Sequence, residues 1–401
     1  MSAEQTPRAM RYIITLIGSR NAGKSSLINA LCGQDVAIVS PEAGTTTDAV
    51  AKAYELLPLG PVTFYDTAGL DDDSSLGKQR IKASQKALYK ADVALVVIGE
   101  KGFSDFDRQI VADLQKMKIP AVVAFNKSDI AEPQPEDEAF CKQHHLPFIA
   151  VSALNNQNLD ELKNLIIAAV PEENKKATPL LGDLVKAKDS IILVTPIDSS
   201  APKGRLILPQ VQVLREILDL HAFSVVTQVE ELSDSIAALK EKPTLVITDS
   251  QAIAEVNKIV PENIAVTTFS ILFARFKGDL KIMVDGAKTI DALKDGAGIL
   301  IAEACSHHAQ DDDIAKVKIP ALLRKYTQKQ LDFTFCTGCD FPDDLEKYDL
   351  VVHCGACMLN RMEMNRRLKE CVRRNVPITN YGVAISKAQG ILNRVVKPLG
   401  L

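Results

Sequence analysis

The 401-residue sequence lacks any apolar run near the roughly 18 residues that a membrane-spanning helix needs. Its opening residues, MSAEQTPRAM, lack the charged and then apolar pattern of a secretory signal. It also lacks an excess of positive charge, since 47 Lys and Arg stand against 51 Asp and Glu, and a net charge of −4 disfavours a dedicated nucleic-acid binder. We therefore expect a cytoplasmic protein that engages neither membranes nor nucleic acids.

The sequence contains no CxxxCxxC motif, which excludes a radical-SAM enzyme. Its 8 cysteines are not expected to form disulfides, because the cytosol keeps thiols reduced. Cys32 and Cys141 lie in the N-terminal part. The others gather in the last quarter of the chain, which indicates a C-terminal metal site: Cys305, Cys336, Cys339, Cys354, Cys357 and Cys371.

The fold class predicted from the pattern is α/β. At roughly 100–200 residues per domain the chain holds two to four domains. Strand-like and helix-like segments alternate, which predicts mainly parallel sheets flanked by helices. A segment rich in Pro and charge, 171–182, is expected to be a linker. We predict three consecutive α/β domains, 1–172, 183–270 and 271–401. The strands expected in the last are LKIMVDGA (280–287), GILIAEAC (298–305), LDFTFC (331–336), YDLVVHC (348–354) and VPITNYG (376–382).

A phosphate-binding loop is predicted at residues 18–25, GSRNAGKS, which fits GxxxxGK[ST]. Backbone N–H groups of such a loop point at phosphates from a helix N-terminus. Lys24 would reach the β- and γ-phosphates, and the Ser25 hydroxyl would bind Mg²⁺. The apolar strand before the loop and the helix after it are both present, so the match has its expected context.

Further motifs follow in the order of a GTP-binding domain: GTTTD (44–48), DTAG (66–69), NKSD (126–129) and SAL (152–154). Asp66 would contact Mg²⁺ through water, and the Gly69 N–H would sense the γ-phosphate. Asp129 accepts two hydrogen bonds from guanine, which adenine cannot donate. We therefore predict a P-loop GTPase, with these nucleotide-binding residues: Gly18, Asn21, Ala22, Gly23, Lys24, Ser25, Ser26, Asp66, Asn126, Lys127, Asp129, Ser152 and Ala153.

The stretches GSRNAGKSSLINAL and DTAGL resemble the translation-factor-like GTPases, especially the tRNA-modification (MnmE-like) group. That resemblance implies that Thr46 is a Mg²⁺ ligand and that Asn21 marks a potassium-activated enzyme. Position 70 is Leu, where Ras-like proteins carry the Gln that positions water. Intrinsic hydrolysis should be slow, or should use another residue, for which Asp71, Asp72 and Asp73 are candidates. Lys24, Thr46, Asp66 and Gly69 are the expected catalytic set.

The cysteines of the last domain are predicted to converge. If the strands that Cys305 and Cys354 end are parallel members of one sheet, both thiols lie at its carboxyl edge, where open α/β sheets place ligands. Cys357 would sit on the turn into the next helix, and Cys336 also ends a strand. An iron–sulfur cluster, a zinc ribbon built from CTGC (336–339) and CGAC (354–357), a redox CxxC and buried thiols remain alternatives. Cys371, within a helix, is most simply core.

The pattern C-x-H … H-C-x-x-C, with HCGACMLNRMEM (353–364) and PKGRLILPQVQ (202–212), resembles HydF, the GTPase maturation factors of FeFe hydrogenases. The resemblance covers essentially the whole chain. It implies a 4Fe–4S cluster on Cys305, Cys354 and Cys357, with His307 and His353 as fourth ligands or nearby contacts. Because CTGC is outside the family pattern, Cys336 or Cys339 could instead fill the fourth position.

The same resemblance implies a function and its partners. Such a protein is a scaffold or carrier for the two-iron subcluster precursor, working with two radical-SAM maturases and apo FeFe hydrogenase. GTP and Mg²⁺ are its other cofactors, and the middle domain forms a homodimer. The alternative from another class is a tRNA-modification or ribosome-associated GTPase with a zinc-stabilised C-terminal domain.

Overall fold

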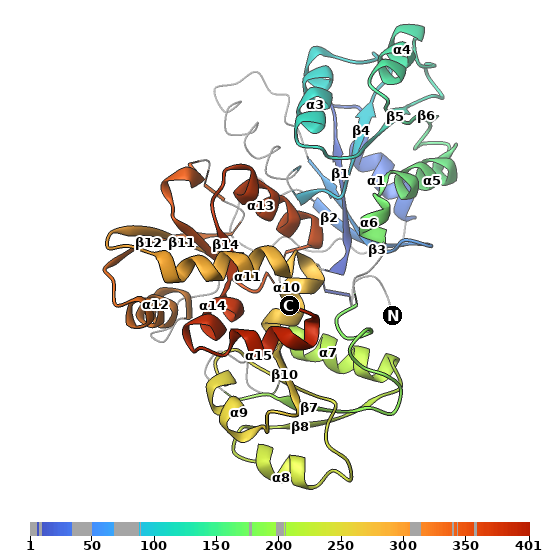
Figure 1. Ribbon diagram of the computed structural model, residues 1–401. Helices are drawn as coiled ribbons and strands as arrows, with labels where there is room; N and C mark the ends of the chain where they lie inside the picture. Colours follow the sequence, from blue (N-terminus) through green and yellow to red (C-terminus); the bar gives the residue numbers. More distant parts are fainter. Residues whose placement is uncertain are drawn as a thin grey trace. The chain divides into compact units, whose positions relative to one another are not determined.

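The chain forms two compact units, residues 1–176 and 177–401, and the boundary falls inside the predicted linker. The computed structural model describes residues 6–7, 10–33, 50–67, 88, 90–175, 179–197, 204, 206–304, 314–338, 341–342, 344–356 and 359–401. The three sheets are shown in Figure 1. All are mainly parallel, as the sequence predicts.

The first unit is a six-stranded sheet in the order β2-β3-β1-β4-β5-β6, in which only β2 and β3 pair antiparallel. Hydrophobic clusters cover both of its faces, which explains why β4 and β5 are buried along their whole length. Its elements are β1 (Tyr12–Ile17), α1 (Lys24–Cys32), β2 (Val50–Leu56), β3 (Gly60–Asp66), β4 (Val93–Ile98), α3 (Asp105–Lys116), β5 (Ala121–Asn126), α4 (Pro135–Gln143), β6 (Phe148–Val151), α5 (Leu159–Ala169) and α6 (Glu172–Lys175).

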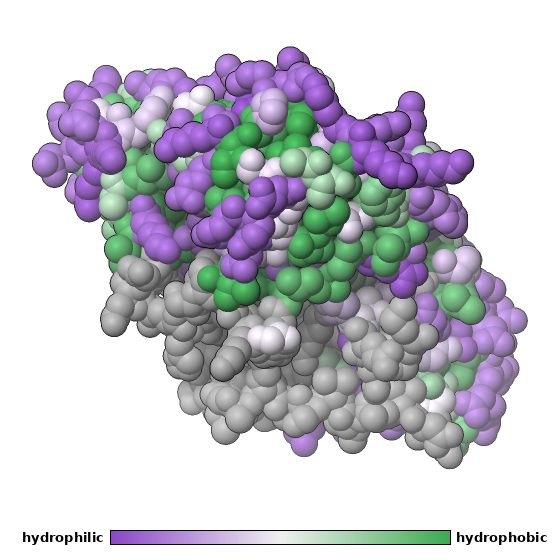
Figure 2. Space-filling model, turned by 90° about the horizontal axis from the view of Figure 1, so that it is seen from below, coloured by the Kyte–Doolittle hydropathy of each residue, from purple (hydrophilic) through white to green (hydrophobic). Residues whose placement is uncertain are grey.

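The second unit begins with a four-stranded parallel sheet in the order β10-β9-β7-β8. Its elements are β7 (Ser190–Val194), α7 (Leu208–Asp219), β8 (Phe223–Thr227), α8 (Leu232–Ala237), β9 (Leu245–Thr248), α9 (Ile253–Ile259), β10 (Ala265–Thr268) and α10 (Phe269–Lys277). Strand β8 is an edge strand, and it carries the half-exposed side chains of Phe223 and Val226. In Figure 2, hydrophobic residues (green) lie among hydrophilic ones (purple) on the coloured part of the surface.

The last sheet, also four-stranded and parallel, has the order β12-β11-β13-β14. Its elements are α11 (Leu280–Lys288), β11 (Ala297–Glu303), α12 (Ile319–Thr327), β12 (Leu331–Thr337), β13 (Leu350–His353), α13 (Arg361–Arg373), β14 (Ile378–Asn380), α14 (Tyr381–Ala388) and α15 (Leu392–Val396). One hydrophobic cluster joins this sheet to the preceding one, with Val246 and Leu300 among its members. Because that core is shared, the division of residues 183–401 into two domains stays a prediction.

The prediction of a strand at LKIMVDGA was wrong, because these residues form α11. The buried positions Leu280, Met283, Val284 and Ala287 recur at the spacing of one helix face. Asp279 caps the helix, and its carboxylate accepts a hydrogen bond from the Ile282 N–H at 3.1 Å. An apolar run this short fits both the two-residue period of a strand and the period of a helix, and here it forms the helix.

The close approach of α11 to β14 predicts a stability defect. A Cβ added at Gly286 would lie 2.0 Å from the carbonyl oxygen of Ile378, a backbone atom that cannot turn aside. Gly286→Ala should lower the free energy of unfolding by about 1–3 kcal/mol, the usual cost of overpacking. Urea denaturation followed by circular dichroism measures this. Lys281→Ala, on the exposed side of the same helix, should change it by less than about 0.5 kcal/mol, and an equal loss in both variants would contradict the packing argument.

Candidate functional site

The loop between β1 and α1 has the backbone of a phosphate-binding loop. Gly18 and Gly23 have φ of 150° and 90°, and Asn21 between them has φ of 63°. A Cβ at Gly18 would lie 2.1 Å from the Val97 carbonyl oxygen, and one at Gly23 would lie 2.2 Å from the Asn126 amide nitrogen. Both glycines of GxxxxGK are therefore required by conformation and by space.

Lys24 and Ser25 start helix α1 at the carboxyl end of the sheet. The Lys24 ammonium is buried and donates to the carbonyl oxygens of Gly18 at 2.7 Å and Ser19 at 2.9 Å. The Ser25 hydroxyl donates to the carboxylate of Asp66, which ends β3 beside β1. The structure thus brings together a lysine, a hydroxyl and a carboxylate that the sequence assigned to phosphate and Mg²⁺.

Asn126, at the end of β5, ties the loop to the side that would bind the base. Its amide donates to the Ala22 carbonyl at 2.9 Å and accepts the Ala153 N–H at 3.1 Å. Asp129 accepts a hydrogen bond from the Ser152 hydroxyl. NKSD and SAL therefore meet, although they were recognised as separate motifs.

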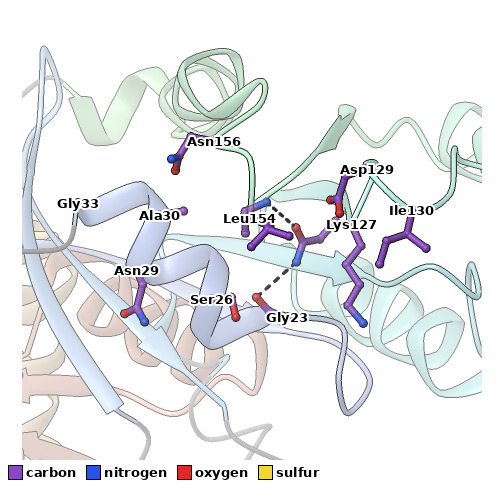
Figure 3. A pocket seen from close by; sticks show the side chains of 12 residues that line it. Gly23, Ser26, Asn29, Ala30, Gly33, Lys127, Asp129, Ile130, Leu154 and Asn156 are labelled. Carbon is purple, nitrogen blue, oxygen red and sulfur yellow. Dashed lines mark hydrogen bonds between the residues drawn. The ribbon is translucent and has the colours of Figure 1, made fainter.

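A cavity of about 580 Å³ lies between these segments. In Figure 3 the side chains of Lys127, Asp129, Ile130 and Leu154 approach it from one side and helix α1 from the other. Its lining residues are Gly23, Ser26, Asn29, Ala30, Gly33, Asn126, Lys127, Asp129, Ile130, Ala153, Leu154 and Asn156. A pocket with one carboxylate at its end fits a purine that offers hydrogen-bond donors.

Asp107 is a site residue that the sequence analysis missed. From the first turn of α3, its carboxylate accepts the Ser19 N–H at 3.1 Å and the Ser19 hydroxyl at 2.9 Å. It also forms a capping box with Ser104. The capping box was readable in SDFD (104–107), but its contact with the phosphate-binding loop depends on the fold.

Several predicted residues lie outside the described residues. They include the switch residues Thr46, Gly69 and Leu70 and the acidic candidates Asp71, Asp72 and Asp73. Of the C-terminal candidates, Cys305, His307, Cys339 and Cys357 are also outside them. Their assigned roles stay predictions.

The carboxyl edge of the last sheet carries the second candidate site. Strands β11 and β13 are parallel neighbours, with Ala302 opposite His353. Cys354, the next residue, donates its N–H to the Ala302 carbonyl at 2.8 Å. Its Sγ accepts the N–H of Ala304 at 3.2 Å. Ala304 is the residue before Cys305. The predicted arrangement of the two strands, which are parallel and end at one edge of the sheet, is confirmed.

Cys336 lies on β12 in register with Ala302, so it belongs to the same row as His353. It is partly buried against the core. Within the described part of the chain, no group of three or more His, Cys, Asp or Glu side chains has the geometry of a metal site. The ligand set predicted from the sequence includes residues beyond that part.

His353 is buried and neutral. Its Nδ1 lies 2.8 Å from the Cys354 carbonyl oxygen, and its Nε2 lies 3.0 Å from a guanidinium nitrogen of Arg367. A carbonyl only accepts and a guanidinium only donates, so the hydrogen is on Nδ1. Burial, followed by the Arg367 charge, lowers the pKa of His353 to about 3. Both ring nitrogens are engaged, an arrangement that favours a supporting contact over metal ligation.

Three other thiols are core residues. Burial raises the pKa of Cys32 to about 11 and the pKa values of Cys141 and Cys371 to about 12. A neutral buried thiol neither binds metal nor reacts readily. The interpretation of Cys371 as core is therefore confirmed.

The strand order, the phosphate-binding loop and the base pocket define the first unit as a P-loop GTP-binding domain. Comparison with protein families agrees: residues 13–127 match the model of a 50S ribosome-binding GTPase. Residues 180–278 match the hydrogen maturase F dimerization domain, and residues 280–398 match the hydrogen maturase F tetramerization domain. The chain belongs to the hydrogen maturase F family.

Curated relatives with sequence similarity include two proteins named GTPase Der. That of Wolinella succinogenes is 36% identical over 174 residues, which are 41% of this chain and 36% of the relative. That of Streptococcus suis is 32% identical over 212 residues, 49% of this chain and 48% of the relative. The chain thus spans at most about half the length of these relatives.

Solved structures with similarity include the G domain of the T. maritima FeoB iron transporter and a variant of Aquifex aeolicus Era bound to GDP·AlF4−. The first has 22% identity and a TM-score of 0.34, covering 40% of this chain and 99% of that one. The second has 22% identity and a TM-score of 0.35, covering 54% and 92%. These scores are too low to carry an argument about function.

Among the residues described, no helix has the length and apolarity to span a membrane.

The bridge made by Asn126 predicts a nucleotide-binding defect. Asn126→Ala leaves the buried Ala22 carbonyl and the Ala153 N–H without their partner, at a cost of about 1–3 kcal/mol. Affinity for GDP should fall roughly 5- to 150-fold in isothermal titration calorimetry. Asn155→Ala, with an exposed side chain on the neighbouring turn, is the matched control. Equal affinities for the two variants would show that Asn126 does not organise the pocket.

Proposed function

We propose that this protein is a GTP-hydrolysing scaffold and carrier in FeFe-hydrogenase maturation. In this proposal it binds a 4Fe–4S cluster and the two-iron subcluster precursor and delivers that precursor to apo-hydrogenase. The main support is a hydrogen bond at the carboxyl edge of the last sheet. The Ala304 N–H donates to Cys354 Sγ at 3.2 Å, and Ala304 is the residue before Cys305. Membership of the hydrogen maturase F family supports the proposal that the precursor is delivered to a hydrogenase.

Two observations on Cys354 at that edge support an iron–sulfur cluster. A backbone N–H aimed at a sulfur favours its thiolate form, which is the form that binds iron. Cys354 is only partly buried, unlike the three core thiols. The proposed ligands are Cys305, Cys354 and Cys357, with the fourth position open to His307, Cys336 or Cys339. His353 is assigned to a supporting contact, because both its ring nitrogens are engaged. The cluster would supply an iron site to which cargo can attach.

The nucleotide half of the proposal assigns roles from the contacts of Lys24, Ser25 and Asp66 and, for Thr46, from the sequence alone. Lys24 neutralises the β- and γ-phosphates, and Ser25 and Thr46 bind Mg²⁺, with Asp66 holding the Ser25 hydroxyl. Asp129 selects guanine. Slow intrinsic hydrolysis is expected, because Leu70 cannot orient water.

Oligomers, maturases and hydrogenase are the proposed partners. Family models for a dimerization and a tetramerization domain support an assembly of several chains. The half-exposed apolar residues on edge strand β8 offer a surface suited to such pairing. The other proposed partners are two radical-SAM maturases and apo FeFe hydrogenase. The proposed location is the cytoplasm.

A ribosome- or tRNA-directed GTPase with a zinc-stabilised second unit is the second candidate. The match of residues 13–127 to a 50S ribosome-binding GTPase model favours it. The net charge of −4 and the position of Cys354 at a strand end, rather than on a hairpin knuckle, weigh against it. Zinc in place of iron after anaerobic purification would select this candidate.

Replacing Cys354 tests the cluster directly. Cys354→Ser should lose most of the iron and sulfide that the anaerobically reconstituted wild type holds, together with the EPR signal of the reduced cluster. Cys371→Ala, which removes a core thiol, should keep the iron content per folded chain. Iron retained by Cys354→Ser at the wild-type level would overturn the ligand assignment.

Exchange of the monovalent cation tests Asn21. The wild-type protein should hydrolyse GTP several-fold faster in KCl than in NaCl at equal ionic strength, because K⁺ held by Asn21 would offset charge on the transferring phosphate. Phosphate release measured in the two salts decides this. Identical rates would leave Asn21 as a residue that only stabilises the loop at its φ of 63°.

A further inference from the structure

Asp107, in the first turn of α3, turns a buried carboxylate toward the phosphate-binding loop. The residue is only 1% exposed. Its Oδ1 accepts the Ser19 N–H at 3.1 Å, and its Oδ2 accepts the Ser19 hydroxyl at 2.9 Å. The same Oδ2 accepts the Ser104 N–H at 3.0 Å and the Ser104 hydroxyl at 2.6 Å. Because the N-terminal end of a helix also stabilises negative charge, the carboxylate is held there as an acceptor of fixed direction.

Ser19 connects Asp107 to the phosphate-binding lysine. The N–H and hydroxyl of Ser19 face Asp107, while its carbonyl oxygen accepts the Lys24 ammonium at 2.9 Å. A displacement of Ser19 would therefore also displace a carbonyl oxygen that Lys24 binds. In this way a carboxylate on α3 influences the position of an ammonium group on α1 through the backbone of a single residue.

The phosphate-binding loop is thus held from two different elements. Asp107 on α3 binds Ser19 at the start of the loop, and Asn126 on β5 binds the Ala22 carbonyl in its second half at 2.9 Å. Between these two points Asn21 has a left-handed φ of 63°. A loop that is already fixed on both sides loses less freedom when phosphates bind, which favours affinity.

The capping box of α3 accounts for only some of these contacts. It consists of the Asp107 N–H donating to the Ser104 hydroxyl at 3.2 Å and the Ser104 N–H donating to Asp107 at 3.0 Å. Neither bond involves Ser19, so capping alone does not explain why both carboxylate oxygens also bind that residue. The contacts with Ser19 indicate a second role at the nucleotide site.

We propose that Asp107 is a positioning residue of the phosphate site, an inference that rests on the nucleotide half of the proposed function. Its carboxylate fixes Ser19, and Ser19 fixes the position of the Lys24 ammonium, which offsets negative charge on the transferring phosphate. Asp107 therefore supports both phosphate binding and the rate of hydrolysis without itself touching the nucleotide.

The test uses the full chain and three variants. Asp107→Ala removes every acceptor, Asp107→Asn keeps one acceptor without charge, and Ser19→Ala removes only the hydroxyl. Asp105→Asn is the matched control, because Asp105 is an exposed acid in the same helical turn. Asp137→Asn is a control for stability, because this buried acid accepts the Phe103 N–H at 3.3 Å. The readouts are GDP affinity by calorimetry, kcat and KM for GTP from phosphate release, and the unfolding temperature.

The expected pattern separates positioning from stability. Asp107→Ala should weaken GDP binding roughly 10- to 150-fold, the effect of losing hydrogen bonds to a charged group. It should also lower kcat at saturating GTP about tenfold. Asp107→Asn should show smaller losses, and Asp105→Asn none. A merely structural role would lower the unfolding temperature, as Asp137→Asn should, and leave kcat per nucleotide-binding site unchanged. Wild-type kcat and GDP affinity in Asp107→Asn and Asp107→Ala would overturn the proposal.

A double-mutant cycle assigns the effect to Ser19. If Asp107 acts through this residue, Ser19→Ala should weaken GDP binding less in the Asp107→Ala protein than in the wild type. Should Asp107→Ala not fold, Asp107→Asn takes its place in the cycle. Strictly additive losses would overturn the route through Ser19.

Hydrogen exchange of the nucleotide-free protein separates this inference from the function on which it rests. If the wild type neither binds GDP nor hydrolyses GTP, the nucleotide half of the proposed function fails, and exchange alone judges Asp107. Amides of residues 19–25 should exchange at least about tenfold faster in Asp107→Asn than in the wild type, because the loop opens more readily. Asp105→Asn should keep the wild-type rate. Equal rates in Asp107→Asn and the wild type would overturn the positioning role.

Discussion

Parallel pairing of buried strands is the constraint on which both candidate sites depend. Parallel strands send the loops that follow them to one edge, and buried strands cannot shift register without exposing apolar side chains. In the first unit, β1 and β3 pair so that the phosphate-binding loop meets Asp66. In the second, β11 and β13 pair so that Ala304 meets Cys354. Each site is assembled from segments far apart in sequence by the same geometry.

Buried polar groups then give these edges their shape. Asn126 joins the phosphate-binding loop to the base side, and Asp107 holds Ser19 of that loop from α3. At the other edge, Arg367 and Lys277 bind the carbonyls of the loops that follow β12 and β13. A buried donor left without its acceptor is costly, so each of these side chains narrows the conformations open to its loop. The loops are therefore organised by buried side chains that bind their backbone groups.

Local pattern was sufficient for much of the fold. Long apolar strands and the glycine-rich loop are legible because they combine period, composition and context, and the alternation of elements predicts parallel sheets. The segment 280–287 was mistaken because a short apolar run satisfies two periods and only its packing against β14 decides between them. Strand β2, antiparallel at the sheet edge, was not foreseen, because an edge strand needs fewer buried side chains. The shared core of the second and third sheets left no trace in the linear pattern.

The sequence by itself determined the nucleotide chemistry, because a phosphate-binding loop and a guanine motif are contiguous runs whose backbone and side chains act together. It also identified the candidate cluster cysteines, since a cysteine that follows an apolar strand pattern can be recognised in the sequence. Only the tertiary structure decided which side chains support the two sites. Asp107 binds Ser19, Arg367 binds His353, and Lys277 binds the Ala356 carbonyl. These partners lie tens of residues apart, or on different helices and strands, and an ordinary Asp, Arg or Lys carries no mark of burial until the fold removes it from water.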